Sequence, residues 1–152
     1  MKTKRHTLLN QWCIIRIFIP LLFLFNTACQ GESPCTDYQL ETPVEVDFKS
    51  TINFCSEPVS ITFSKLIGDS RCPENVQCIW QGLVELEVIL AVNGTEEKFT
   101  LSSYPPFNGI PSEVEFKGYL FKLMDVTPYP NTTKSYSEKD YTVILEVEKT
   151  EE

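Results

Sequence analysis

Histidine is almost absent from this sequence of 152 residues, whose single histidine is His6. His6 lies in a segment that we expect to be removed during export, so the mature protein has no imidazole. This excludes catalysis by Ser-His-Asp or Cys-His groups and metal sites with histidine ligands. No other catalytic constellation stands out, and we expect no enzyme activity, no metal site and no cofactor.

Positive charge is scarce after the first 28 residues. Those residues hold four of the 13 basic residues and no acid, so the rest of the chain has nine basic and 21 acidic residues, a net charge of −12. A surface this acidic repels phosphate backbones and anionic lipid headgroups, which makes nucleic acid a poor partner. It would attract cationic proteins or divalent cations, or serve only to keep an exported domain soluble.

Residues 1–28 have the organisation of a secretory signal peptide. A basic start is followed by the apolar run Ile17–Phe25 and by small residues that end at Ala28. The apolar run is too short to cross a bilayer, and Arg16 prevents its extension toward the N-terminus. We therefore expect residues 1–28 to be removed.

The residues around Cys29 resemble the lipobox of bacterial lipoproteins. Cys29 directly follows Ala28, although Asn26 stands where that family usually has leucine. The resemblance implies that Cys29 is acylated, with palmitate among the acyl chains, and that the polar residues 29–42 form a lipid-anchored tether. Gln30 after the cysteine favours the outer membrane in that family. The alternative is ordinary cleavage after Ala28, which would leave Cys29 as an odd thiol.

Four cysteines remain once Cys13 is removed with the signal peptide and Cys29 is assigned to the anchor: Cys35, Cys55, Cys72 and Cys78. An even number of cysteines in an exported domain predicts disulfides. Three pairings are possible, and we favour Cys72–Cys78 with Cys35–Cys55 because Pro73 and Asn75 can turn the short loop back on itself. A zinc site with four thiolates is the alternative, but paired C-x2-C spacing is missing.

From Val44 onward the hydrophobic pattern has a period of two, which predicts β-strands. We expect strands at residues 44–48, 59–64, 84–92, 98–101, 116–124 and 141–148. Asn93-Gly94 is a strong hairpin signal, whereas residues 102–115 and 126–139 are predicted to be irregular. The pattern predicts that residues 43–150 form an all-β, antiparallel two-sheet β-sandwich of the immunoglobulin-like kind. A partly open barrel is the alternative.

The stretch from Asp69 to Gly82 reads D-S-R-C-P-x4-C-x-W-x-G. It resembles a motif of small exported bacterial β-domains, many of them lipoproteins, for which no activity is established. Asp69 can accept N–H bonds within a turn or form a fork with Arg71. Trp80 can pack on a disulfide, as tryptophans do in sandwich cores. Ligand binding is the alternative role for Trp80 and Arg71.

Three further aromatic residues lie in proline-rich loops: Tyr104, Phe107 and Tyr129. Rigid aromatic side chains in loops form the rims of sugar- or peptide-binding sites. They could instead fold back over the ends of the sandwich. Together with Trp80 and Arg71, they are the candidate residues for binding a glycan or a cationic protein.

Acidic residues are numerous, but no motif singles out two of them for acid–base catalysis. Glu85 and Glu87 could collect a cation with Glu96 or Glu97 across the Asn93-Gly94 turn. Calcium would need more oxygen ligands than these side chains supply.

Taken together, the sequence predicts a lipid-anchored, extracytoplasmic binding or structural module that catalyses nothing and is held on a membrane through Cys29. One alternative is an inhibitor of a cationic hydrolase, such as a lysozyme or a protease, because an acidic surface and stiff loops would suit a basic cleft. A further alternative is a carboxylate-dependent hydrolase, which requires two acids in one pocket.

Overall fold

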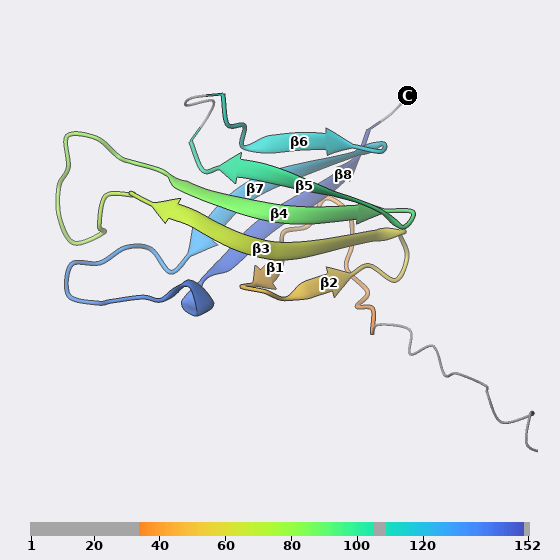
Figure 1. Ribbon diagram of the computed structural model, residues 1–152, viewed down its shortest axis with the longest axis horizontal. Helices are drawn as coiled ribbons and strands as arrows, with labels where there is room; N and C mark the ends of the chain where they lie inside the picture. The colour runs from red at the N-terminus through yellow and green to blue at the C-terminus, as the bar shows by residue number, and fades with distance from the viewer. Residues whose placement is uncertain (1–33, 105–108, 151–152) are drawn as a thin grey trace, which may run out of the picture. The chain divides into compact units, whose positions relative to one another are not determined.

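The structure is a computed structural model, and it describes residues 34–104 and 109–150 (Figure 1). Within these residues, eight strands form two antiparallel sheets of four strands each. The strands are β1 (Val44–Asp47), β2 (Thr51–Asn53), β3 (Val59–Asp69), β4 (Val84–Val92), β5 (Thr95–Ser102), β6 (Glu113–Phe116), β7 (Tyr119–Thr127) and β8 (Thr142–Lys149), and the short 3-10 helix η2 (Glu138–Asp140) precedes β8. The predicted signal peptide, the proposed anchor Cys29 and the loop residue Phe107 lie outside the described residues.

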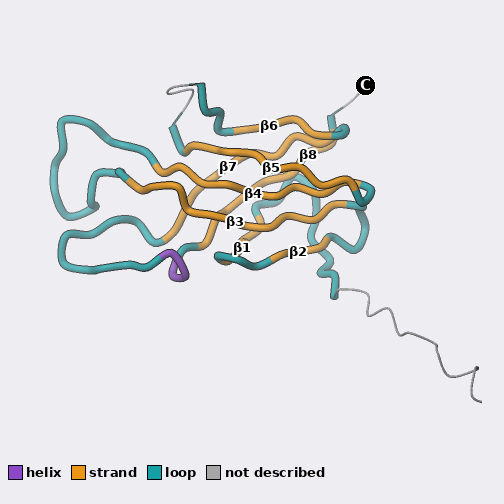
Figure 2. The backbone as a smooth tube through the Cα atoms, in the orientation of Figure 1, coloured by secondary structure: helices purple, strands orange, loops and turns teal. Residues whose placement is uncertain are grey.

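Neighbouring strands in each sheet follow one another in the sequence, except that the first strand, β1, pairs with the last, β8. One sheet has the order β1-β8-β7-β6 and the other has the order β2-β3-β4-β5. Among the described strands, the chain changes sheet between β1 and β2 and again between β5 and β6 (Figure 2). The two sheets are not closed into a barrel, which confirms the predicted two-sheet sandwich.

The core lies between the sheets and follows the predicted alternation. Alternate residues of β4 are buried: Val84, Leu86, Val88, Leu90 and Val92. Successive side chains of a strand point to opposite faces, so this pattern turns one face of β4 inward. Phe63 from one sheet and Phe121 from the other are fully buried in the same hydrophobic cluster. Burying a side chain of this size contributes roughly 1.5–3 kcal/mol.

The strand predicted at residues 116–124 is instead a hairpin. Lys117 and Gly118 form the turn between β6 and β7, and both have positive φ, 52° and 82°. This geometry is typical of two-residue hairpin turns, and the Lys-Gly pair is not among their strongest sequence signals. As a result, β6 occupies part of the segment predicted to be irregular. The short strand β2 was also not predicted, because three residues are too few to show a period.

Both favoured disulfides are present, Cys35–Cys55 and Cys72–Cys78. The first attaches the N-terminal segment to the sandwich next to a parallel bridge between Thr36 and Phe54. The ring of Tyr38 packs on Phe54 with 5.4 Å between centroids. The last part of the predicted tether of residues 29–42 therefore lies against the folded domain.

The two ends of the sandwich are differently built. The loop of residues 70–83, between β3 and β4, and the loop of residues 128–141, between β7 and β8, leave the sandwich at the same end (Figure 1). The described chain begins at the other end, where the Pro34 carbonyl accepts a hydrogen bond from Asn53. Asn53 pairs with Ser60 at the far end of β3, about 30 Å along the strand from Asp69.

Candidate functional site

The candidate site is the pair of loops at the end opposite Pro34, residues 70–83 and residues 128–141, called here the loop pair. These segments are far apart in the sequence, but hydrogen bonds join them along their length. Most residues of the Asp69–Gly82 motif lie in the first loop.

Arg71 is the residue that ties the two loops to the sandwich. Its side chain is buried, and its guanidinium forms a fork with the Asp69 carboxylate through Nε at 2.9 Å and Nη2 at 2.6 Å. The guanidinium also donates to the carbonyl oxygens of Val126 and Pro128, and its Cζ lies 4.6 Å from the ring centroid of Tyr129. These contacts within the fold favour the fork predicted for Arg71 and Asp69 over the alternative role of Arg71 in ligand binding.

Both carboxylate oxygens of Asp69 are also occupied by hydrogen bonds. Its Oδ1 accepts from the backbone N–H and Nε of Arg71, and its Oδ2 accepts from Nη2 of Arg71 and from the Tyr141 hydroxyl. Burial, and next the neighbouring Asp69 charge, raise the pKa of the Tyr141 phenol above its ordinary value. Four donors occupy the four lone-pair sites of a carboxylate. Asp69 therefore has no free oxygen lone pair for substrate chemistry.

The Ser70 and Gly82 positions bring the two arms of the first loop together. The backbone N–H and the hydroxyl of Ser70 both donate to the carbonyl of Leu83. Gly82 has φ +67°, and a Cβ at this position would lie 1.9 Å from the Ser70 carbonyl oxygen. Only glycine fits so close an approach. The glycine that ends the motif is thus required by local geometry.

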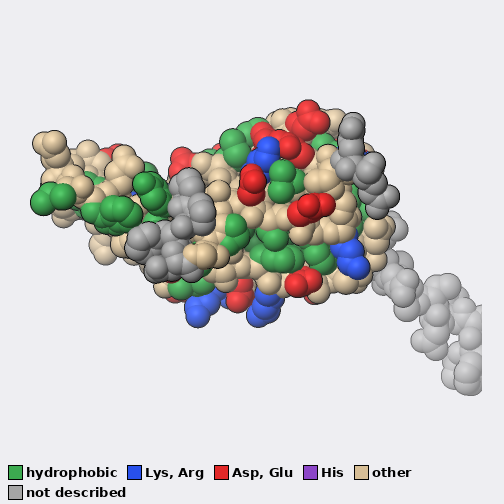
Figure 3. Space-filling view, turned by 90° about the horizontal axis from the view of Figure 1, so that it is seen from above, with side chains coloured by type: hydrophobic (Ala, Val, Ile, Leu, Met, Phe, Trp, Pro, Cys, Tyr) green, Lys and Arg blue, Asp and Glu red, His purple; other side chains and the backbone are tan. Residues whose placement is uncertain are grey.

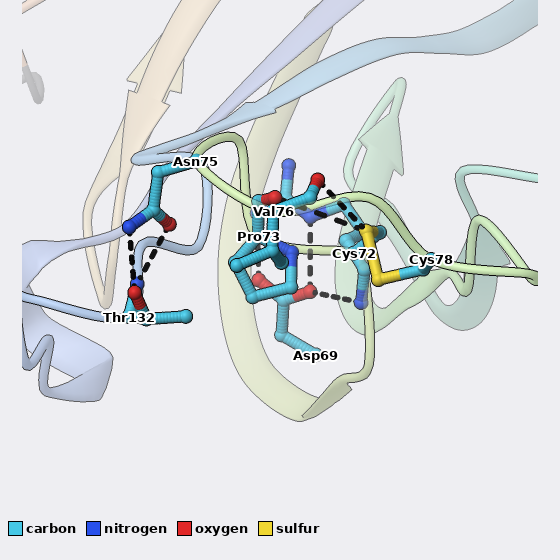
Figure 4. Close-up of a disulfide and its surroundings, with 8 residues drawn as sticks. Asp69, Cys72, Pro73, Asn75, Val76, Cys78 and Thr132 are labelled. Atoms are coloured by element: carbon cyan, nitrogen blue, oxygen red, sulfur yellow. Dashed lines mark hydrogen bonds and ion pairs between the residues drawn. A yellow bond between two sulfur atoms is a disulfide. The ribbon is translucent and has the colours of Figure 1, made fainter.

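A second row of contacts joins the loops further from the sandwich. Asn75 donates from Nδ2 to the Thr132 hydroxyl at 2.6 Å and accepts the Thr132 backbone N–H at 3.0 Å (Figure 4). Next to this pair, Asn131 donates to the Glu74 carboxylate at 2.7 Å, and the Glu74 backbone N–H donates to the Pro130 carbonyl. The Cys72–Cys78 disulfide closes the same loop. The loop pair is cross-linked as one unit.

This unit presents apolar side chains to solvent. Of the seven large hydrophobic side chains exposed among the described residues, four lie on the loop pair: Val76, Ile79, Trp80 and Tyr129. Ile79 is fully exposed. The space-filling view shows green side chains gathered on this lobe, at its left, while acidic side chains lie over the sandwich (Figure 3). In residues 70–83 the charged residues are Arg71, which pairs with Asp69, and Glu74, which accepts a hydrogen bond from Asn131. Residues 128–141 add Lys134, Glu138, Lys139 and Asp140. The exposed apolar side chains therefore lie mainly on the first loop of a cross-linked unit, and the second loop carries most of its charge.

The predicted binding aromatics do not form one cluster. Trp80 contacts Tyr104, with 5.5 Å between ring centroids and an angle of 63°, and both are partly exposed. Tyr129 packs over Arg71 instead. Phe107 lies outside the described residues. The structure thus brings Trp80 and Tyr104 together. Tyr129 instead joins Arg71 and Asp69 in a separate group of contacts, called here the Arg71 cluster.

A groove that was not foreseen runs beside Trp80. It has a volume of about 390 Å³ and is lined by Gly68, Asp69, Ser70, Trp80, Leu83 and Glu85. Glu85 is half-buried, and within the described residues its carboxylate has no hydrogen bond or ion pair. The groove could not be predicted from the sequence, because glycine and leucine residues do not mark a binding site. The Asp69–Gly82 motif also does not show that a groove lies beside Trp80.

The possible cation site of Glu85 and Glu87 with Glu96 or Glu97 does not come together in the described residues. Glu87 accepts a hydrogen bond from the Ser64 hydroxyl and pairs with Lys98. Glu96 and Glu97 stand opposite Ala91 and Leu90, about 17–20 Å along β4 from Glu85. Across the described residues, no three His, Cys, Asp or Glu side chains are grouped for a metal ion. The hairpin was predicted well, but its length separates the carboxylates.

The disulfides also bear on location. Disulfides form and persist in oxidising compartments, and the two found here are consistent with a place outside the cytoplasm. In residues 34–104 and 109–150, no helix has the length and apolar character needed to cross a membrane.

Comparisons of the chain with protein-family models, with curated proteins and with solved structures gave no match in any of the three.

Proposed function

We propose that this protein is a lipid-anchored, extracytoplasmic binding module that holds a partner protein through the loop pair. The observation that carries the proposal is the full exposure of Ile79 on a loop that a disulfide and the Arg71 cluster hold rigid. The lipobox-like residues before Cys29 and the resemblance of the motif to small exported bacterial β-domains support the anchor and the compartment.

Exposed apolar surface on a stiff protrusion suits recognition. An apolar side chain gains free energy when a partner removes it from water, in proportion to the area covered. A loop that is already ordered loses little conformational entropy on binding, which leaves more of that gain as affinity. The cross-links between Asn75 and Thr132 and between Cys72 and Cys78 therefore make Val76 and Ile79 effective contact residues.

The proposed anchor would direct the loop pair away from the membrane. Cys29 lies five residues before Pro34, a stretch of at most about 17 Å. Pro34 is at the end of the sandwich opposite the loop pair (Figure 1). An acylated Cys29 would thus hold the Pro34 end near the bilayer and present Ile79 outward, where a partner can reach it.

Binding fits the groove better than hydrolysis by two carboxylates. Asp69 and Glu85 both line the groove, which is the arrangement that a carboxylate-dependent hydrolase needs. Both oxygens of Asp69 are occupied by Arg71 and Tyr141. An acid held in this way cannot exchange a proton with a substrate or attack it.

An inhibitor of a cationic hydrolase is the second candidate. The projecting lobe with Ile79 at its surface could enter a cleft, and the net charge of −12 after residue 28 would speed association with a basic enzyme. Residual activity of lysozymes and proteases would be measured against the purified protein at low and high salt. Inhibition that weakens with salt supports this candidate, and full activity throughout the panel rejects it.

The anchor is tested by growing cells with an alkyne fatty acid and comparing the full-length protein with its Cys29→Ser variant. We expect label on the first and none on the second. Unlabelled protein released in soluble form would contradict the anchor, whatever the loop pair does.

The binding surface is tested by placing the photocrosslinker p-benzoylphenylalanine at position 79 or at position 124 in cells. Met124 is the matched control because it is 51% exposed on β7, outside the loop pair. We expect a discrete crosslinked species from position 79 alone. The crosslinked partner would then be identified and its affinity for the protein measured. Ile79→Asp should weaken this affinity by about tenfold or more, as for a central hot-spot residue. Equal affinity for Ile79→Asp and Met124→Asp would overturn the proposal.

A further inference from the structure

We propose that the groove beside Trp80 is a subsite for one arginine side chain of the partner protein. This deepens the proposed function and rests on it, because it names the chemistry of the partner at the base of the loop pair. The groove combines an indole wall, an acidic side chain without an ion pair among the described residues, and open space.

Among the described residues that line the groove, Glu85 alone carries a charge without an ion pair. Asp69 lines the same space, but the Arg71 guanidinium neutralises it at 2.6 Å. Glu85 is half-buried and has no ion pair within the described residues, unlike Glu87 two positions later on the same strand face, which pairs with Lys98. A partly desolvated carboxylate gains from a cation placed beside it. One net negative charge calls for one positive side chain.

Trp80 supplies the second element of cation recognition. Its side chain lines the groove and is 50% exposed, and its contact with Tyr104 helps to hold the indole in place. Tryptophan attracts cations more strongly than tyrosine or phenylalanine, and arginine is found against it more often than lysine. A guanidinium can contact an aromatic ring and a carboxylate at once, because it is planar and has five donors.

Gly68 leaves the space that such a side chain needs. It stands opposite Glu85 in the pairing of β3 with β4, and a Cβ added at Gly68 would meet no atom within 4 Å. The resulting volume of about 390 Å³ lies at the small end of the range for ligand sites. It therefore suits one side chain rather than a large ligand.

The charge of the whole domain favours the same partner. A net charge of −12 after residue 28 raises the encounter rate with a basic protein. A glycan would instead need several polar groups that converge on its hydroxyls, and in the groove Asp69 already has both oxygens occupied. We therefore argue for arginine, and binding of a sugar is an outcome that would reject it.

The test uses the fluorescence of Trp80. The chain has two tryptophans, Trp12 and Trp80, so the full chain carrying Trp12→Phe reports on Trp80 alone. It is titrated with Nα-acetylarginine amide and, in parallel, with Nα-acetylcitrulline amide, which has nearly the same shape and no charge. We expect a saturable change with the arginine derivative and about tenfold weaker binding of the citrulline derivative, from loss of the cation–π and ionic contacts.

Two variants locate the effect. Glu85→Gln should weaken binding of the arginine derivative by roughly fivefold or more, whereas Glu113→Gln, which makes the same charge change at an exposed position of β6, should leave it nearly unchanged. Gly68→Leu should abolish binding by filling the groove, and its backbone φ and open surroundings permit the fold. Circular dichroism of each variant confirms that the sandwich is intact.

Equal binding of the citrulline derivative, or an unchanged affinity for Glu85→Gln, would overturn the proposal. So would saturation of the Trp80 signal by N-acetylglucosamine but not by the arginine derivative. This result is independent of the crosslinking at position 79. Binding of the arginine derivative without a crosslink would support the groove as an arginine subsite and reject Ile79 as a contact residue. A crosslink at position 79 without binding of the arginine derivative would support Ile79 as a contact residue and reject the arginine subsite.

Discussion

The Arg71 guanidinium and the Asp69 carboxylate are held two residues apart in a buried fork, with Nε–Oδ1 at 2.9 Å and Nη2–Oδ2 at 2.6 Å. Their side chains are 4% and 7% exposed. The same guanidinium donates to carbonyl oxygens 55 and 57 residues further along the chain. This one ion pair therefore connects the β3–β4 loop to the end of β7, and the orientation of the loop pair depends on it.

Removal of Arg71 should be severely destabilising. Arg71→Met leaves the Asp69 charge buried without its partner, which typically costs about 3–5 kcal/mol of unfolding free energy. Urea denaturation followed by circular dichroism measures the loss. The double variant Asp69→Asn/Arg71→Met should lose less than the sum of the two single variants, because it leaves no unpaired buried charge. Additive losses, or a loss below about 1 kcal/mol for Arg71→Met, would show that the pair is not coupled as described.

Gly82 should tolerate alanine much less well than Gly94, although both have positive φ, +67° and +75°. At Gly94 an added Cβ meets nothing within 4 Å, so Gly94→Ala costs only the left-handed backbone, about 1–2 kcal/mol. At Gly82 the Cβ would lie 1.9 Å from the Ser70 carbonyl oxygen, so the loop must also move. Thermal unfolding of both variants makes the comparison, and equal losses would contradict the close approach.

The two disulfides should differ in what their loss affects. Replacing Cys72 and Cys78 by serine should cost about 2 kcal/mol, and replacing Cys35 and Cys55 should cost about 3 kcal/mol, because the second bridge closes the longer loop. The first replacement should also weaken partner binding, since it frees the loop that carries Ile79. Replacement of Cys35 and Cys55 should leave the affinity for the partner unchanged under conditions in which the domain is still folded. The affinity of each variant for the partner crosslinked at position 79 tests this difference.

Tyr119 should ionise late in an alkaline titration. Burial, and next the hydrogen bond to Glu57 at 2.7 Å, raise the pKa of Tyr119 to about 12. Since the fold favours the neutral phenol, its contribution to stability is complete below the ordinary tyrosine pKa of 10.0 and is lost as the pH rises through about 12. Glu57→Gln should lower this pKa but leave it above the ordinary value, because burial remains.

The titration is followed by tyrosinate absorbance, with Tyr119→Phe as the control that identifies the signal. The control is needed because the pKa of Tyr141 is also raised. The same hydrogen bond from Tyr119, followed by the one from Lys149, lowers the pKa of Glu57. Glu57 therefore stabilises the fold at neutral pH and loses that contribution as the pH falls below its ordinary pKa. Ionisation of Tyr119 together with the exposed tyrosines would contradict the burial.

Local patterns were enough to predict most of the sandwich. The alternation in residues 84–92, the Asn93-Gly94 turn and the two disulfide pairs all agree with the structure. Prediction failed where the signal was short or unusual, as at β2 and at the Lys117-Gly118 turn. The Asp69–Arg71 fork could also be proposed, since its members are two residues apart.

The sequence by itself determined the longer strands, because a strand buried on one face must repeat every second residue whatever lies opposite. It also determined the short cross-links, whose partners are close along the chain. Only the tertiary structure decided that Arg71 joins the β7 end, that Ile79 is fully exposed and that Gly68, Trp80 and Glu85 surround one groove. These features depend on how loops that are far apart in the sequence pack against each other. A periodic pattern within one strand gives no information about that packing.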